Sequence, residues 1–430
     1  MANVYLISSG GNWSNGAVWN TGTIPTAADD VFTNGFSVNV DVSFTVLSLR
    51  NTASSPIVSG GFFIFNTAGV TGTVTSSSPL VPGGNNLVQI TATTGTVTLS
   101  LGGSVTPRNT TNDVLISYSG NCNFNLSGTN FNGATSSTGP TCISKTSGGL
   151  ITINGNLNGA NGATNGSTLS SNNGNTVVIG NVVGGISPNG LNRAISQSAG
   201  TLTVTGNVTG GQGVTTNQGI VFSGTSLTVT GTILGGTASA AIDSSAPINN
   251  ITGNVTAGTV AAIASTSANI VNVTGTVTAS ATSPAITSTN ANGQVYLNGN
   301  MVNNNGKMAI FAPIVWLDTT GTTSAAFFTS GGVARTLYSA DTVPNTPTAN
   351  NVRSGTIYGA GNSLVGTIVM PVAANVRNGV TYDNGTTGTA LFTTSLFLTE
   401  LSSSTVPVAV RMQNLCTPMI LGELMEAYKR

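Results

Sequence analysis

The sequence predicts an all-β chain: a right-handed parallel β-helix with a smaller C-terminal β-rich module and a short terminal α-helix. A short phrase, an alternating strand interrupted by one glycine, recurs seven times between residues 150 and 304. Its central glycines lie 22 to 26 residues apart, a period typical of one solenoid coil. These glycines are Gly155, Gly180, Gly206, Gly231, Gly253, Gly275 and Gly299.

A second marker lies upstream of most of these strands and consists of a small residue followed by isoleucine. The isoleucines advance by 21 to 25 residues, in step with the glycines. Because a coil buries its apolar face only by stacking on its neighbours, two markers in step indicate stacked, equivalent coils. The pairs are Ala194-Ile195, Gly219-Ile220, Ala241-Ile242, Ala262-Ile263, Ala285-Ile286 and Ala309-Ile310.

Each coil contains a strand, a glycine corner and a shorter second strand. Alternation of β-branched residues with period two predicts strands. Glycine at the corner permits positive φ or a close approach of two backbones. A leucine-rich repeat has a similar period, but its LxxLxLxxN strand and helical return are absent from this sequence. Crossover handedness favours a right-handed coil.

Charge is scarce, at 5% of all residues, and the net charge is zero. Between Thr146 and Gly306 the charged residues are Arg193 and Asp243. The chain is 39% apolar and rich in β-branched residues, so we expect an ordered fold. A groove that follows phosphates needs several cations on one face, so we expect no nucleic-acid partner.

The N-terminus has no basic and apolar segment of the signal-peptide kind, and no run of about 18 apolar residues predicts a membrane helix. We therefore expect a protein made in the host cytoplasm. The cysteines Cys122, Cys142 and Cys416 lack metal-site spacing and indicate no disulfide. The first two lie about one coil apart, and we expect buried structural thiols.

No catalytic residue, cofactor site or metal site is predicted. Histidine is absent, which removes the Ser-His-Asp and Cys-His triads and the usual zinc ligand sets. A β-helix that cleaves polysaccharides needs paired carboxylates about 5–10 Å apart on neighbouring coils. Asp243 is instead expected to face Val221 and Ala264, and Asp29 and Asp30 to lie on opposite faces of a strand. A carboxylate pair shared between chains of a trimer stays open.

Residues 1–50 are predicted to form an N-terminal cap and the first coils. They contain, in order, Trp13, Trp19, Gly22, Pro25, Asp29 and Asp30. This order resembles the opening of many right-handed β-helix domains in bacterial surface proteins and phage proteins. The first coil has no neighbour below it, so Trp13 and Trp19 are expected to cover the open end and the aspartates to discourage further stacking. A sugar-binding platform is the alternative role of the two tryptophans.

The β-helix is predicted over residues 51–325, followed by the β-rich module over residues 326–416. Residues 351–367 and 375–389 of this module carry two copies of an NVRxG repeat. The Gly-Thr pairs that close the two copies are two residues closer together than the other matched residues, which predicts a shorter turn in the second copy. Residues offset by 24 are Arg353 and Arg377, Gly355 and Gly379, Tyr358 and Tyr382, and Gly361 and Gly385.

This repeat, P-x-A-x-N-V-R-x-G-x-x-Y-x-x-G, resembles one near the C-terminus of fibre-like and decoration-like structural proteins of tailed bacteriophages. The resemblance implies membership of a virion rather than an activity. We expect Arg353 and Arg377 to pair with a carboxylate or carbonyl of a neighbouring copy, and Tyr358 and Tyr382 to pack against a turn. Stabilisation of turns within one chain is the alternative.

Residues 417–430 are predicted to form an amphipathic helix. Thr417 is a suitable N-cap, with Pro418 at the first helical position. One face carries Leu421, Leu424, Met425 and Tyr428 at helical spacing. This face could pack on its own chain, on sister chains of a trimer or on an adjoining virion protein.

These observations predict a structural component of a phage virion. The first hypothesis is a tail fibre or spike that contacts the host surface without catalysis, with a host-surface glycan as candidate partner. The alternative is a capsid decoration or head fibre, and a polysaccharide depolymerase and a bacterial surface adhesin rank lower. We expect a homotrimer, because three rods side by side cover their apolar outer faces, and contact with other virion proteins through the C-terminal region.

Overall fold

The computed structural model describes residues 3–83, 86–108, 114–133, 141–161, 166–187, 192–213, 217–267, 269–302, 304, 309–317, 336–339, 357–358, 364–365, 381–382, 386–387 and 389. The chain divides into two units. The first comprises Met1–Thr346 with Gly359–Gly361, and the second Pro347–Tyr358 with Asn362–Arg430.

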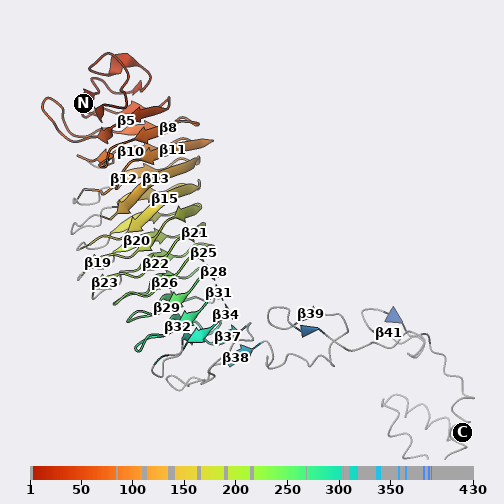
Figure 1. Ribbon diagram of the computed structural model, residues 1–430. Coiled ribbons are helices and arrows are strands. Elements are labelled where there is room, and N and C mark those ends of the chain that lie inside the picture. Colours follow the sequence, from red (N-terminus) through yellow and green to blue (C-terminus); the bar gives the residue numbers. More distant parts are fainter. Residues whose placement is uncertain are drawn as a thin grey trace, which may run out of the picture. The chain divides into compact units, whose positions relative to one another are not determined.

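The first unit is an all-β parallel solenoid, as the sequence predicts. Its coils stack in sequence order from the N-terminal end, and successive coils pair through parallel strands (Figure 1). Within the described residues, helix is confined to one short 3-10 turn, η1 (Gly16–Val18).

Two of the sheets start at the N-terminal end. A four-stranded sheet contains β1 (Asn3–Tyr5), β3 (Asp30–Phe32), β6 (Ser48–Arg50) and β9 (Leu80–Val81). A 13-stranded sheet contains β2 (Gly11–Asn12), β4 (Val38–Asn39), β7 (Phe63–Phe65), β10 (Val88–Ile90), β12 (Val114–Tyr118), β14 (Thr141–Lys145), β16 (Ser167–Ser171), β20 (Arg193–Gln197), β24 (Ile220–Phe222), β27 (Ile242–Ser244), β30 (Ile263–Ser265), β33 (Ile286–Ser288) and β36 (Ile310–Phe311).

A second long sheet starts with β5 (Phe44–Val46), β8 (Thr71–Val74), β11 (Thr96–Leu101), β13 (Asn123–Asn132) and β15 (Ile151–Asn158). The following coils each contribute one strand before the glycine corner and one after it. These pairs are β17 (Thr176–Ile179) and β18 (Val182–Val183), β21 (Thr201–Thr205) and β22 (Val208–Thr209), β25 (Ser226–Thr230) and β26 (Ile233–Leu234), β28 (Ile248–Thr252) and β29 (Val255–Thr256), β31 (Ile270–Thr274) and β32 (Val277–Thr278), and β34 (Gln294–Asn298) and β35 (Met301–Val302).

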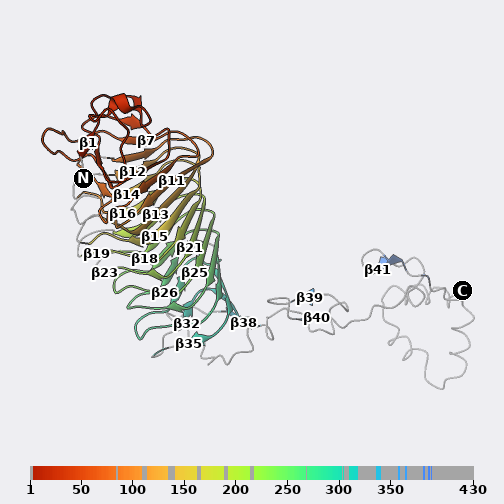
Figure 2. The same cartoon turned by 45° about the horizontal axis from the view of Figure 1, so that its top comes forward.

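This sheet ends with β37 (Ile314–Leu317) and β38 (Thr336–Ser339). A small separate sheet of β19 (Ile186–Ser187) and β23 (Gln212–Gly213) lies at one edge of the solenoid (Figure 2).

The predicted isoleucine column is confirmed. Ile195 pairs in register with Ile220 of the next coil, and the pairing continues from coil to coil through Ile242, Ile263, Ile286 and Ile310. All six side chains are buried. Since a slip of one residue would turn every side chain of a strand to the other face, this column sets the register of the coils.

The seven repeated glycines form the corner of each coil. Their φ angles lie between 143° and 154°, a region that other residues rarely adopt. Successive corners are also in backbone contact: a Cβ added to Gly231 would collide with the carbonyl oxygen of Gly206, one coil earlier. The same collision occurs between Gly253 and Gly231. The corner therefore requires glycine for its φ angle and for the closeness of the coils.

An asparagine follows the corner glycine in several coils and bonds to the next coil. Asn156 Oδ1 accepts from the backbone N–H of Asn181 at 2.9 Å, and Asn181 Oδ1 accepts from that of Asn207 at 2.9 Å. Asn207 Oδ1 in turn accepts from Thr232 N–H at 2.9 Å. These bonds satisfy backbone donors beside the corner and fix the alignment of adjacent coils.

Aromatic rings fill the N-terminal end of the solenoid. Trp13 and Trp19 are each 1% exposed and meet edge to face, with ring centroids 5.0 Å apart. Trp13 stacks on Phe44 at 4.2 Å, and Trp19 Nε1 donates to the Trp13 carbonyl at 3.1 Å. Because both indole rings are buried, neither presents a face on which a sugar could stack.

The second unit contains one two-stranded antiparallel hairpin in each NVRxG copy. Strands β39 (Ile357–Tyr358) and β40 (Leu364–Val365) pair Tyr358 with Leu364. Strands β41 (Thr381–Tyr382) and β42 (Thr386–Thr387) pair Tyr382 with Thr386. Five residues separate the first pair and three the second. The predicted shorter turn of the second copy is confirmed.

Replacing Gly231 by alanine tests the corner. We expect Gly231→Ala to lower the free energy of unfolding by about 3 kcal/mol or more, because strain at positive φ adds to the collision with Gly206. Gly69→Ala is the matched control, since Gly69 has a φ of 80° and no atom within 4 Å of an added Cβ. It should cost only about 1 kcal/mol. Equal losses in urea unfolding would contradict the role of backbone contact.

Candidate functional site

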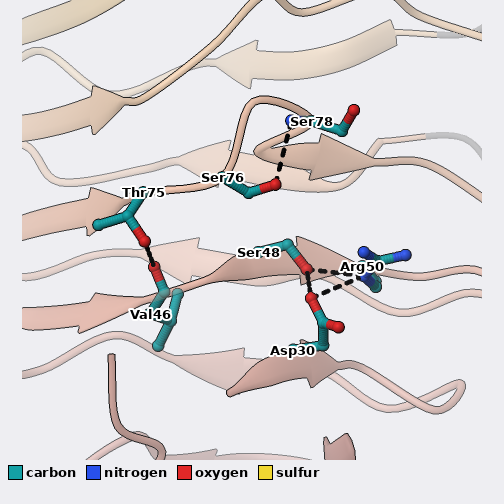
Figure 3. Close-up of polar contacts among 7 residues, drawn as sticks. All are labelled: Asp30, Val46, Ser48, Arg50, Thr75, Ser76 and Ser78. Atoms are coloured by element: carbon teal, nitrogen blue, oxygen red, sulfur yellow. Dashed lines mark hydrogen bonds and ion pairs between the residues drawn. The ribbon is translucent and has the colours of Figure 1, made fainter. Parts of the chain in front are cut away.

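A cluster of three polar residues on the four-stranded sheet is the candidate site, and we call Asp30, Ser48 and Arg50 the N-terminal polar cluster (Figure 3). Arg50 Nε lies 3.2 Å from Asp30 Oδ1, which is the one ion pair found among the described residues. The cluster is therefore the strongest concentration of paired charge in the part of the chain that the structure describes.

Strand pairing brings the cluster together. Strands β3 and β6 are parallel, with Asp30 opposite Ser48 and Phe32 opposite Arg50. Because successive side chains alternate between the faces of a strand, Val31 enters the apolar core, where it is fully buried. The flanking residues of both strands consequently share the outer face.

The cluster is internally hydrogen-bonded. Ser48 Oγ donates to Asp30 Oδ1, and Arg50 Nε donates to the same carboxylate oxygen and to Ser48 Oγ, at 2.6 Å. The guanidinium also lies over the Phe32 ring, 5.7 Å from its centroid. The Arg50 side chain remains 28% exposed and that of Asp30 16%. Three contacts thus position a guanidinium that solvent still reaches.

A second arginine reaches the same sheet from a later coil. Arg108 Nη1 donates to the carbonyl of Gly83, which lies two residues beyond Val81 of β9. Val81 is the register partner of Arg50. The two arginines are 58 positions apart in the sequence. Arg50 lies opposite β9, and Arg108 bonds to the segment that follows β9.

Sequence reasoning missed Ser48, Arg50 and Arg108. A glycosidase site would pair two carboxylates on neighbouring coils, whereas Asp30 is paired with a serine and an arginine. Asp30 and Arg50 are 20 residues apart, which is close to the length of a coil. This spacing of opposite charges is the sequence signal that could have indicated the pair.

Asp29 and Asp30 take different roles. Asp29 Oδ2 accepts from the backbone N–H and the hydroxyl of Thr26, both at 2.8 Å, and closes a turn. Asp30 joins the polar cluster. Both carboxylates are therefore engaged within their own chain.

The register confirms that Val221 and Ala264 flank Asp243. Burial raises the pKa of the Asp243 carboxyl, and the positive charge of Arg193 opposes that shift. Arg193 and Asp243, the two charged residues between Thr146 and Gly306, thus interact electrostatically. Among the described residues, strand register places no carboxylate opposite Asp243, so the geometry shows no paired acid and base there.

The other predicted assembly residues are placed only in part. Tyr358 and Tyr382 each end the first strand of their hairpin. The remaining six lie outside the described residues; they are Arg353, Arg377, Leu421, Leu424, Met425 and Tyr428.

Among the described residues, no three His, Cys, Asp or Glu side chains gather in an arrangement suited to a metal ion. No helix in the same residues has the length and hydrophobicity needed to cross a membrane.

Comparison with known proteins found no relative. No protein-family model matches the chain, and neither the curated proteins nor the solved structures contain a match.

A buried lysine and two buried thiols lie inside the solenoid. Lys145 is fully buried; its Nζ donates to the carbonyl of Asn173 and lies 5.9 Å from the centroid of the Tyr118 ring. Burial lowers the pKa of Lys145 to about 8. Cys122 and Cys142 are free and buried, as predicted, and burial raises the pKa of both thiols.

The lysine should make stability depend on pH. Between the folded pKa of about 8 and the ordinary value of 10.5, the unfolded state binds more protons, so stability should rise with pH. The free energy of unfolding of the wild type minus that of Lys145→Met should grow by up to about 1 kcal/mol per pH unit from pH 8 to 10. Contributions of the thiols cancel in this difference. A flat difference in urea unfolding would show that Lys145 titrates normally.

Proposed function

We propose that this chain is a structural component of a phage virion, a tail fibre or spike that contacts the host surface without catalysis. The observation that carries the proposal is the unbroken parallel stacking, in which one sheet runs through 13 strands. Such a stack holds its two ends at a fixed separation, because each coil is hydrogen-bonded to the next along its length. A fibre needs this property.

The repeat in the second unit supports the virion assignment. Its two NVRxG copies resemble a phrase of tailed-phage structural proteins, and each copy contains a two-stranded antiparallel hairpin whose first strand ends at its tyrosine. Repetition of one small hairpin suits a connecting or attachment segment better than a catalytic domain, since neighbouring copies offer equivalent contacts.

The outer face of the solenoid supports a homotrimer as part of the proposal. One outward column beyond the glycine corner contains Val183, Leu234 and Val302, which are 37%, 42% and 44% exposed. Threonines occupy the intervening coils of this column. An uncharged column of this kind can be covered by a second copy without desolvating charges.

A capsid decoration or head fibre is the second candidate. Among the described residues, the large apolar side chains that are exposed are all aliphatic. Receptor contacts commonly use aromatic side chains, so this surface favours a structural role over adhesion.

Immunogold electron microscopy of purified particles tests the proposal. Gold on the tail or its fibres is the expected result, and a glycan-binding screen would follow. Gold spread over the capsid would favour the decoration protein instead. Particles without gold would remove the virion assignment and restore the cell-surface adhesin.

Deleting residues 417–430 tests attachment through the predicted terminal helix. We expect the truncated chain to keep the circular dichroism and melting temperature of the solenoid but to be missing from assembled particles. Leu421→Ala is a milder companion change that should reduce incorporation without abolishing it, because one apolar contact of the helix face is lost. Normal incorporation of the truncated chain would contradict an anchoring role.

A further inference from the structure

The Arg50 guanidinium has one edge occupied and one edge open. Its Nε bonds to Asp30 and Ser48, while Nη1 and Nη2 have no hydrogen-bond partner among the described residues. In Figure 3 the dashed lines from Asp30 and Ser48 reach one nitrogen of Arg50 and leave the other two without a contact among the residues drawn. The four N–H donors of these nitrogens are therefore available to a ligand.

This guanidinium is also held in place before any ligand arrives. Two hydrogen bonds fix its Nε, and its Cζ lies over the Phe32 ring, 5.7 Å from the ring centroid. Ser48 is fully buried, so the hydroxyl that orients Arg50 is itself held by packing. A preoriented arginine loses less side-chain entropy on binding than a freely rotating one.

Arg108 adds positive charge nearby. Its Nη1 donates to the carbonyl of Gly83, and Gly83 lies two residues, or roughly 7 Å of extended chain, beyond Val81, the register partner of Arg50. Asp30 pairs with Arg50, but its carboxylate lies on the Nε edge of that side chain. Elsewhere in the described residues cations are sparse: the others are Lys145, which is buried, and Arg193.

We propose that Arg50, with Arg108 as a second cation, forms a binding site for an oxyanion group, a carboxylate or a phosphate. Both groups match the planar donor pair of a guanidinium and accept two parallel hydrogen bonds from it. Acidic sugars and phosphorylated polymers carry these groups, and the site takes the group rather than a particular polymer. The inference is independent of the virion assignment, because it depends only on the polar cluster and Arg108.

Calorimetric titration of the full-length chain at low ionic strength, where charge interactions are least screened, tests the site. The probes are inorganic phosphate and glucuronate, in separate titrations. We expect saturable binding of at least one probe, and at least about tenfold weaker binding by Arg50→Lys, which keeps the charge and loses the planar donor pair. The matched control is Arg193→Lys, which should bind as the wild type does.

Arginine modification by phenylglyoxal, read by mass spectrometry, gives a second measurement on the wild-type chain if Arg50→Lys does not fold. The bound probe should protect Arg50 and Arg108 but leave Arg193 reactive. Binding of phosphate alone or of glucuronate alone would assign the oxyanion class, and binding of both would assign a shared site. Absence of binding by both probes, equal affinity of Arg50→Lys and the wild type, or no protection of Arg50 would overturn the proposal.

Discussion

Backbone contact between successive glycine corners is the constraint on which the rest of the repeated solenoid depends. At φ angles near 150° each corner turns the chain, and no Cβ separates it from the corner one coil earlier. The strands on either side can therefore approach to hydrogen-bonding distance in register. The isoleucine column and the asparagine bonds are consequences, since both need coils that are stacked and aligned.

This stacking also limits where chemistry can occur. A column position repeats in every coil, so a charge placed there would meet like charges above and below if it were repeated. The sequence between Thr146 and Gly306 has only two charged residues, Arg193 and Asp243, and so fits that restriction. Charges can gather where the repeat is irregular, and the polar cluster of Asp30, Ser48 and Arg50 lies among the first coils. The ion pair found among the described residues thus lies in the irregular first coils and not in the repeated ones.

Much of the solenoid could be predicted because its signals are local and repeated. Glycine and isoleucine spacings predicted the corners and the internal column, and the offset of the Gly-Thr pairs predicted the shorter second turn at Tyr382. The N-terminal polar cluster and the neighbouring contact of Arg108 could not be predicted in the same way. These residues come from coils of unequal length, so no constant period relates Asp30, Arg50 and Arg108.

The sequence by itself determined the all-β parallel solenoid, the corner glycines and the register of the repeated coils, because these follow from a period that each coil repeats. Only the tertiary structure decided which faces the irregular residues share. It buried Trp13 and Trp19 against Phe44, enclosed Lys145 and left the outer edge of Arg50 open. Such outcomes depend on contacts between residues at unrelated spacings, which exist only when the coils are stacked.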